Sequence, residues 1–267
     1  RTITIISFYS EDPDVEARRG FGPFTPGFKI SKFNDVEDLK SKVNDTTIAV
    51  LLEPIQGEGG IIPAEPSFYS LIHELSKKFN FLVIADEIQC GLFRAGTLTC
   101  SEQYNIKPDI LILGKSLGGG LIPLSAVLAN SHIFAPMGIG SHGSTYGGSP
   151  LASRVGLEVV RFISKNRENL EMQITHKGKM LTEALLQLKS KHPIISDVRG
   201  KGLMLGLELE CPVDQFVKKC FELGLILGKT RSNTVRLTPP LVISEDELYF
   251  AVECIDKALS CIDLSCC

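Results

Sequence analysis

The sequence predicts an α/β fold with a mostly parallel sheet, one reversed strand, and a smaller C-terminal α+β domain. Three short apolar runs, at residues 48–52, 81–85 and 110–113, each end at a charged residue or at a glycine–lysine pair. Short continuous apolar runs are typical of strands that are buried on both faces. Between the first two runs, residues 66–79 carry apolar side chains at helical spacing. A strand–helix–strand unit of this kind joins parallel strands.

The first elements follow from apolar spacing and turn signals. Residues 1–7 predict the entry to a strand, and residues 35–44 predict a short helix. Residues 11–28 are rich in glycine, proline and charge, which predicts a loop. The chain begins at Arg1 without a methionine and enters a strand at once. We therefore expect the sequence to be cut from a longer protein.

After Lys115 the connection to the next apolar run becomes short. A glycine-rich segment at residues 116–123 leads directly into the apolar residues 124–129. A crossover between parallel strands needs a dozen or more residues, usually an α-helix. We therefore expect this last strand of the sheet to run antiparallel to its neighbour.

The order of the predicted elements changes near Pro150, shortly before the smaller domain begins. Ser244 and Glu247 have the spacing of a capping box at the start of a final helix. We divide the chain into residues 1–156, part of a large domain whose N-terminal portion we expect to be missing, and residues 157–267, a small α+β domain. The further elements that we expect are helices at 151–164, 168–190 and 213–223 and strands at 198–210, 225–228 and 234–238.

Composition and charge disfavour several functions. The 267 residues are 43% hydrophobic and 22% charged, as in ordinary globular proteins, and the net charge is −3. This balance gives no reason to expect nucleic acid or an anionic membrane as a partner. The apolar runs are far shorter than the roughly 18 residues of a membrane helix.

The eight cysteines do not predict a metal site. No two are spaced as CxxC, and the five histidines form no HxxxH pair. We expect free thiols in a reducing compartment, with the cytoplasm preferred and the mitochondrial matrix left open. The alternative is an oxidised, regulatory pair, for which the adjacent Cys266 and Cys267 are unusual candidates.

The candidate site lies where the predicted parallel strands end. Ligands of open α/β sheets bind outside the carboxyl ends of the strands, and Glu53, Asp86 and Lys115 stand at those ends. A lysine shielded from water beside the triple glycine 118–120 would be held as a neutral amine that can form a Schiff base. Asp86 suits the protonated nitrogen of a planar pyridine ring. The alternative is a solvated lysine beside a flexible loop.

Two phosphate-binding patterns near these residues are incomplete or weak. Gly114-Lys115-Ser116 matches the end of a P-loop, but the position that requires the first glycine holds Asp109, so we reject a P-loop. The glycines near Glu58 lack the full GxGxxG spacing. Residues 142–149 combine glycines with small hydrogen-bond donors before a helix, and such a turn can bind phosphate.

Five stretches together resemble the class III (ornithine-type) aminotransferases across nearly the whole chain. The resemblance implies a fold type I enzyme that depends on pyridoxal 5′-phosphate (PLP) and works as a homodimer, with its sites at the subunit interface. The stretches are Glu53-Pro-Ile-Gln-Gly-Glu-Gly-Gly, Asp86-Glu-Ile-Gln-Cys-Gly, Gly114-Lys-Ser-Leu-Gly-Gly-Gly, His142-Gly-Ser-Thr-Tyr-Gly-Gly and Val235-Arg-Leu-Thr-Pro-Pro-Leu.

The resemblance also assigns cofactor-binding roles to four residues. Lys115 is implied to carry PLP covalently, and Asp86 to pair with the pyridine nitrogen. Gln89 is implied to reach the 3′-oxygen of the ring. Thr145 is implied to cross the dimer and bind the phosphate of the partner's PLP.

Three further residues are implied to bind substrate. Arg236 would bind the α-carboxylate of glutamate or 2-oxoglutarate, and Arg1 would lie near the other carboxylate. Glu58 would cover Arg236 while an amine end of the substrate is bound. The glycines on both sides of Glu58 predict a loop with the freedom to swing aside.

The implied reaction moves the δ-amino group of L-ornithine to 2-oxoglutarate, giving glutamate 5-semialdehyde, which cyclises, and glutamate. An acetylornithine or GABA type of transamination is the alternative within the family. A truncated product that acts only as a dimerisation partner is the alternative outside catalysis. The family's phosphate cup, the aromatic residue that stacks on PLP, and a tyrosine at the substrate gate would all lie upstream of Arg1.

Overall fold

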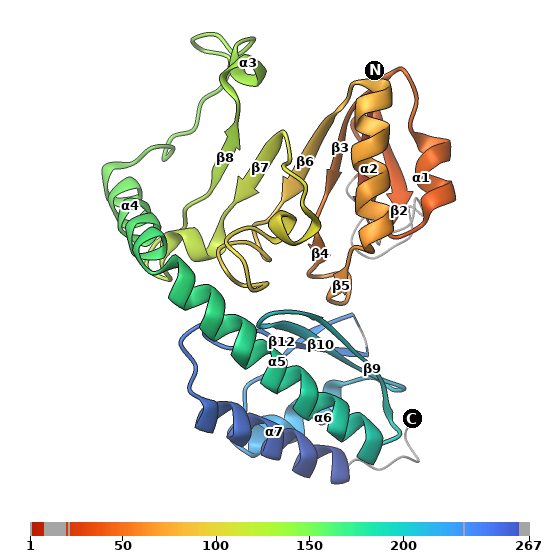
Figure 1. Ribbon diagram of the computed structural model, residues 1–267, viewed down its shortest axis with the longest axis vertical. Coiled ribbons are helices and arrows are strands. Elements are labelled where there is room, and N and C mark those ends of the chain that lie inside the picture. The colour runs from red at the N-terminus through yellow and green to blue at the C-terminus, as the bar shows by residue number, and fades with distance from the viewer. Residues whose placement is uncertain (1, 8–19, 21, 232, 262–267) are drawn as a thin grey trace. The chain divides into compact units, whose positions relative to one another are not determined.

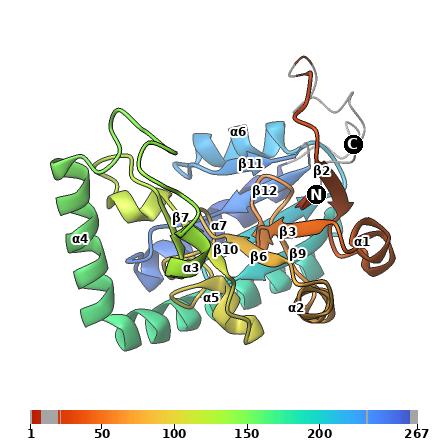
Figure 2. The same ribbon diagram turned by 90° about the horizontal axis from the view of Figure 1, so that it is seen from above.

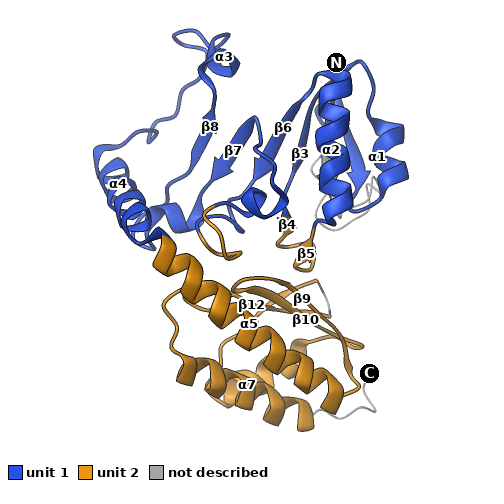
Figure 3. Cartoon of the chain, in the orientation of Figure 1, with its two compact units in different colours: residues 1–54, 64–92, 99–167 blue, residues 55–63, 93–98, 168–267 orange. Residues whose placement is uncertain are grey.

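A computed structural model of the chain describes residues 2–7, 20, 22–231 and 233–261. The chain forms two compact units (Figure 3). Unit 1 comprises residues 1–54, 64–92 and 99–167, and unit 2 comprises residues 55–63, 93–98 and 168–267. The expected domain boundary after residue 156 stays a prediction. The two units are defined by their compactness, which does not show whether either of them folds by itself.

Unit 1 is built on a six-stranded sheet in the order β2-β1-β3-β6-β7-β8 (Figure 1). All neighbouring strands are parallel except β7 and β8, which are antiparallel. The predicted mostly parallel sheet with one reversed strand is therefore confirmed. The strands are β1 Thr2–Ser7, β2 Phe28–Lys32, β3 Thr47–Leu52, β6 Leu82–Asp86, β7 Ile110–Leu113 and β8 Ala126–Ala129.

Two helices cover one side of this sheet and lie side by side (Figure 2). The helix α2 runs from Pro66 to Phe79, as predicted, with proline at its start and the left-handed Asn80 at its end. It packs against β6, and α1 (Val36–Lys42) packs against β2. The apolar positions of α2 at helical spacing are the ones that become buried, namely Phe68, Tyr69, Ile72 and Leu75.

The opposite end of the sheet, at β8, exposes apolar side chains. Val127 and Leu128 are 55% and 47% exposed, and Leu121 before them is 81% exposed. Short helices occur at Cys100–Tyr104 (η1), Lys115–Gly118 (η2) and Ser131–Phe134 (α3). The helix α4 (Pro150–Lys165) adds Leu151, Leu157, Val160 and Phe162 to the exposed apolar residues of unit 1.

Unit 2 contains an antiparallel sheet in the order β11-β12-β10-β9, with helices on one face (Figure 1). The strands are β9 Ile195–Lys201, β10 Met204–Leu209, β11 Gly228–Thr230 and β12 Thr234–Leu237, and the helices are α5 Arg167–Lys191, α6 Asp214–Glu222 and α7 Glu245–Ser260. The predicted capping box is present, since Ser244 Oγ accepts from Glu247 N and the Glu247 side chain accepts from Ser244 N.

Alternate residues of β10 build the core of unit 2. Leu205, Leu207 and Leu209 are buried among residues of α5, α6 and α7. Side chains alternate along a strand, so Gly206 and Glu208 face the other side of the sheet. A small hairpin of β4 (Ile55–Gln56) and β5 (Ile62–Pro63) belongs to unit 2 and contacts β9.

Several sequence expectations differ from these elements. The strand β2 was not expected, and most of the predicted loop at 11–28 lies outside the described residues. The strand expected at 225–228 begins only at Gly228, because Leu225 and Leu227 pack against the core of unit 2 instead of pairing in the sheet. The hairpin of β4 and β5 was not expected either. Within the described part of the chain, no helix is long and apolar enough to cross a membrane.

Candidate active site

Asp86 and Lys115 lie at the ends of two neighbouring parallel strands. Asp86 is the last residue of β6 and pairs with Ile112 of β7, and Lys115 stands three positions after Ile112. Adjacent strands lie about 4.8 Å apart, so a carboxylate and an amine emerge from the same edge of one sheet. This edge is formed by the carboxyl ends of the strands, where open α/β sheets bind ligands.

The backbone at Lys115 has an unusual conformation. Its φ angle is +43°, in the left-handed region that residues other than glycine rarely adopt. The turn is closed by the hydrogen bond from Leu117 N to Gly114 O at 3.0 Å. A side chain at Gly114 would meet Ile88 at 3.2 Å, so glycine allows the turn after Asp86 to approach Lys115 closely. Such strained residues cluster at functional sites.

The expected shielding of Lys115 from water is wrong for this chain. The side chain of Lys115 is exposed, as are Ser116 and the two glycines after Gly118. Lys115 stands in the turn past the end of β7, where the glycines have no side chains that could cover it. The described residues therefore offer the amine without the dry surroundings that we predicted.

The turn after β6 carries the other cofactor candidates. The Asp86 carboxylate accepts a hydrogen bond from Ile88 N at 3.0 Å, which fixes its direction. Gln89 lies in the same turn and is partly buried. The turn closes through Gly91 N to Glu87 O at 2.9 Å, and a Cβ atom at Gly91 would lie only 2.7 Å from that oxygen.

Glu87 is a site residue that the sequence analysis missed. It is 1% exposed, and its N–H donates to Ile112 O at 3.0 Å. Its carboxylate accepts from Cys100 N at 2.5 Å, Ser101 N at 2.9 Å and Ser101 Oγ at 2.6 Å. Burial raises the pKa of Glu87. The available signal was a second acid directly beside Asp86 at the end of a buried strand.

Two further predicted residues are Thr145 and Arg1. Thr145 lies on an exposed segment that leads into α4. The resemblance places its role in a partner subunit, so its exposure leaves that role a prediction. Arg1 lies outside the described residues. Among the described residues there is no cluster of three or more histidine, cysteine or acidic side chains that could hold a metal ion.

Unit 2 brings Glu58 and Arg236 together. Glu58 lies in the loop between β4 and β5, and its carboxylate forms an ion pair with Arg236 of β12. The Arg236 side chain is 25% exposed, whereas that of Glu58 is 60% exposed. The acid is therefore the partner of this pair that has more solvent around it.

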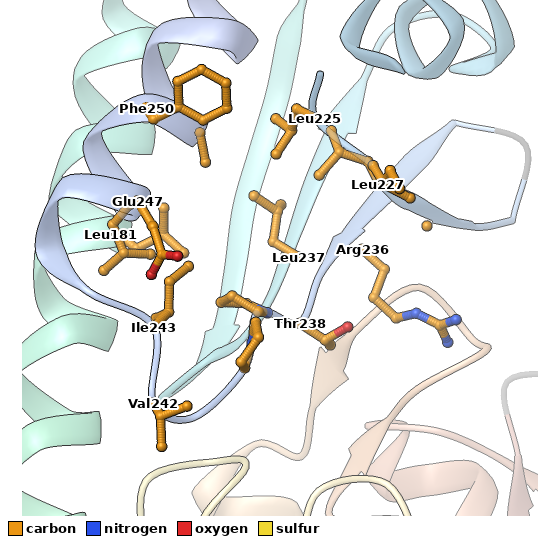
Figure 4. A pocket seen from close by; sticks show the side chains of 16 residues that line it. Leu181, Leu225, Leu227, Arg236, Leu237, Thr238, Val242, Ile243, Glu247 and Phe250 are labelled. Atoms are coloured by element: carbon orange, nitrogen blue, oxygen red, sulfur yellow. The ribbon is translucent and has the colours of Figure 1, made fainter. Parts of the chain in front are cut away.

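A pocket of about 520 Å³ lies beside Arg236 within unit 2 (Figure 4). Most of its wall is apolar, with Leu225, Leu237, Ile243 and Phe250 as examples. The guanidinium group of Arg236 stands at one edge and points away from Phe250 and Ile243. The pocket thus has an apolar interior and a cationic edge.

Comparisons with known proteins agree with this geometry. The family described as Aminotransferase class-III matches residues 1–259. The chain is 42% identical over 259 residues to an ornithine aminotransferase of Brevibacillus brevis, covering 97% of this chain and 63% of the relative. It is 41% identical over 248 residues to an acetylornithine aminotransferase of Clostridium acetobutylicum, covering 93% and 62%. The chain thus spans less than two thirds of the length of these relatives.

The solved structures give the same assignment. An ornithine aminotransferase from Toxoplasma gondii superposes with a TM-score of 0.90 at 33% identity, covering 97% of this chain and 64% of that one. An acetylornithine aminotransferase from Elizabethkingia anophelis superposes with a TM-score of 0.85 at 36% identity, covering 97% and 65%. By its sequence and its fold, this chain belongs to the class-III aminotransferase family.

Proposed function

We propose that this chain carries the lysine, the ring-binding acid and the substrate switch of a PLP-dependent ornithine aminotransferase. The observation that carries the proposal is the placement of Asp86 and Lys115 at the carboxyl ends of adjacent parallel strands. The reaction would move the δ-amino group of L-ornithine to 2-oxoglutarate. Relatives named ornithine aminotransferase, at about 40% identity, support this choice.

The donor set fits PLP. A planar ring with a basic nitrogen, a phenolic oxygen and an aldehyde needs an acid, a hydrogen-bond donor and an amine, and Asp86, Gln89 and Lys115 supply them. Gly119 and Gly120 have positive φ angles beside Lys115, and a Cβ atom at Gly120 would meet no atom within 4 Å. This open space suits a ligand that lies close to the backbone.

Each residue has a defined task in the proposal. Bound PLP supplies an electron sink that stabilises negative charge on the substrate carbon. Asp86 keeps a proton on the ring nitrogen, and the hydrogen bond from Ile88 N holds the carboxylate in place. Gln89 binds the 3′-oxygen. The Nζ atom of Lys115 holds the cofactor covalently.

Arg236 and Glu58 select between the two substrates. The Arg236 guanidinium group can bind the α-carboxylate of 2-oxoglutarate or glutamate. When ornithine presents its cationic δ-amine, Glu58 neutralises Arg236 and removes a repulsive charge. The ion pair between the two side chains supports this role, because it holds the Glu58 carboxylate against the Arg236 guanidinium group.

The assembly we propose is a homodimer with the sites at its interface. The exposed apolar residues of β8 and α4 favour an additional covering surface, since a monomer rarely exposes a large contiguous apolar patch. In this dimer Thr145 would bind the phosphate of the partner's cofactor. Acetylornithine transamination is the second candidate, favoured by the relative from Clostridium acetobutylicum.

Borohydride reduction tests the role of Lys115. The chain is incubated with PLP, reduced and digested, and the modified peptide is identified by mass spectrometry. We expect one tag, on Lys115, and none after Lys115→Ala. Lys107→Ala is the matched control, because Lys107 is an exposed lysine shortly before β7. A tag that stays after Lys115→Ala would contradict the proposal.

Glu58→Ala tests the switch. Without its cover, Arg236 stays open to carboxylates, so we expect the ratio of kcat/KM values to shift toward glutamate and away from ornithine as amino donor. The shift should be up to about 5-fold, since an ion pair whose acid is 60% exposed is worth at most about 1 kcal/mol. Glu210→Ala replaces an exposed acid of the same unit and should leave the ratio unchanged. An unchanged ratio in Glu58→Ala would remove Glu58 from substrate selection.

A further inference from the structure

Two arginines stand on either side of Gly206 in the sheet of unit 2. Gly206 pairs with Arg199 of β9 on one side and with Arg236 of β12 on the other. Directly paired residues of antiparallel strands share a face, and this face is the one opposite the core helices. A Cβ atom at Gly206 would lie 3.0 Å from Cβ of Ile61. The end of the Glu58 loop therefore lies directly on the sheet, between the two arginines.

The backbone of the Glu58 loop (residues 57–60) is held at both ends. Thr230 Oγ1 lies 2.5 Å from the carbonyl oxygen of Glu58 and 3.2 Å from that of Gly57. Arg199 Nε donates to the carbonyl oxygen of Gly60 at 2.8 Å. Thr230 is 3% exposed, so its hydroxyl group contacts the loop away from solvent. The glycines of this loop therefore do not leave the backbone free to swing.

The residue after the loop adds a third anchor. Ile61 is fully buried, although its φ angle of +54° lies in the left-handed region. Gly60 before it has a φ angle of +112°, and a side chain there would meet Cδ of Arg231 at 2.9 Å. The backbone at the end of the loop is thus held in an uncommon left-handed conformation by a buried side chain.

The other contacts of Arg199 fix its side chain in the position where it binds Gly60 O. Its Nη1 atom lies 3.0 Å from Asp197 and 2.5 Å from Glu208, and its Nη2 atom lies 3.3 Å from Thr234 Oγ1. The Arg199 side chain is 15% exposed. Two carboxylates balance its charge, which makes it a poor site for a substrate carboxylate. The Glu58 side chain, which pairs with Arg236, is 60% exposed, whereas Asp197 and Glu208, which pair with Arg199, are 47% and 28% exposed.

We propose that Thr230 and Arg199 are positioning residues that fix the Glu58 loop, so that Arg236 is uncovered by rotation of the Glu58 side chain alone. This inference rests on the proposed role of Arg236 and adds how that role is controlled. Because the backbone stays in place, the carboxylate returns to the same position after each substrate. A loosened loop would place the carboxylate less well and leave Arg236 open for more of the time.

Thr230→Val provides the test, because it removes the hydroxyl group and keeps the shape of the side chain. The first measurement is hydrogen exchange at the amides of Gly60 and Ile61, which both donate to Gly57 O at 3.4 Å. We expect faster exchange by roughly 3- to 10-fold, the effect of one lost hydrogen bond. Thr182→Val is the matched control, since Thr182 Oγ1 donates to Gly178 O at 2.8 Å within α5.

The second measurement is the binding of 2-oxoglutarate to the PLP-loaded protein by calorimetry. We expect Thr230→Val to tighten binding by about 3-fold or more, and to have no effect when Glu58 is already alanine. Arg199→Lys, which keeps the charge but loses the Nε donor, should act in the same direction. A merely structural role would change binding equally with and without Glu58, and that result would overturn the inference.

The two proposals can fail separately. Binding of 2-oxoglutarate that does not depend on Arg236, tested with Arg236→Gln, would contradict the proposed function. Unchanged exchange at Gly60 and Ile61 in Thr230→Val would contradict the positioning role even if Arg236 binds the carboxylate.

Discussion

Glu87 gives a prediction whose size follows from its contacts, because one buried carboxylate satisfies three donors. It accepts from Cys100 N, Ser101 N and Ser101 Oγ, and Glu87 is 1% exposed. In Glu87→Ala two buried N–H groups lose their acceptor, at a cost of about 1–3 kcal/mol each. Removing a buried charge offsets part of that cost. We expect the free energy of unfolding to fall by about 3 kcal/mol.

Glu87→Gln separates the effect of charge from the effect of shape. It keeps the size of the side chain but turns an NH₂ group toward a backbone N–H, so we expect a loss of about 1–2 kcal/mol near pH 4. Burial raises the pKa of Glu87, so the folded chain keeps this proton to a higher pH than the unfolded chain. The wild-type chain therefore loses stability as the pH rises through the folded pKa, and the variant does not. The difference between the two proteins should shrink toward neutral pH.

Unfolding in guanidinium chloride, followed by circular dichroism at about pH 4 and about pH 7, measures these differences. Glu102→Gln is the matched control, because Glu102 forms a surface ion pair with Arg167 at 3.0 Å. Such a pair is worth at most about 1 kcal/mol. A Glu87→Ala protein within about 0.5 kcal/mol of the wild type would refute the reasoning, as would a Glu87→Gln loss that grows with pH.

Four further predictions concern the cofactor, the small unit and the exposed surface. Asp86→Ala should lower kcat of the PLP-loaded enzyme by about 10²-fold or more, because the ring nitrogen loses a buried charge-assisted bond; near-normal turnover would remove Asp86 from the mechanism. Gly206→Ala should cost about 1–3 kcal/mol in chemical unfolding, because its Cβ meets Ile61; an unaltered midpoint would show that the loop can give way. Ser244→Ala should cost about 1 kcal/mol through the lost cap of α7. The chain by itself should self-associate through β8 in sedimentation velocity, and Leu128→Glu should reduce this; a monomer at all concentrations would contradict it.

Local signals predicted the elements whose ends are marked in the sequence. The helix at 66–79 has proline at its start and Asn80 at its end, so its bounds were predicted correctly. The reversed strand β8 followed from the short connection after Lys115. The strand β2 was missed because it is only five residues long, lies at the edge of the sheet and follows directly on the glycine- and proline-rich residues that predicted a loop.

The remaining features depend on contacts between distant parts of the chain. Arg199 holds Gly60 across 139 residues, and Thr230 holds Glu58 across 172. No local pattern marks these pairs, so the glycines around Glu58 predicted a mobile loop where the structure holds its backbone. The exposure of Lys115 was not predicted either, because the burial of a residue depends on which other parts of the chain cover it.

Three acids show how surroundings divide tasks among similar side chains. In the described part of the chain, Asp86 accepts one hydrogen bond, from Ile88 N, which orients the carboxylate and leaves acceptor capacity for a ligand. Glu87 accepts three from buried donors, which fix its carboxylate against residues 100 and 101 and hold the turn in place. Glu58 pairs with one arginine on the surface, from a fixed backbone, so its carboxylate can leave and return. An acid can bind a cofactor, anchor a turn or act as a switch according to the number of donors around it and their burial, and here those donors come from the fold.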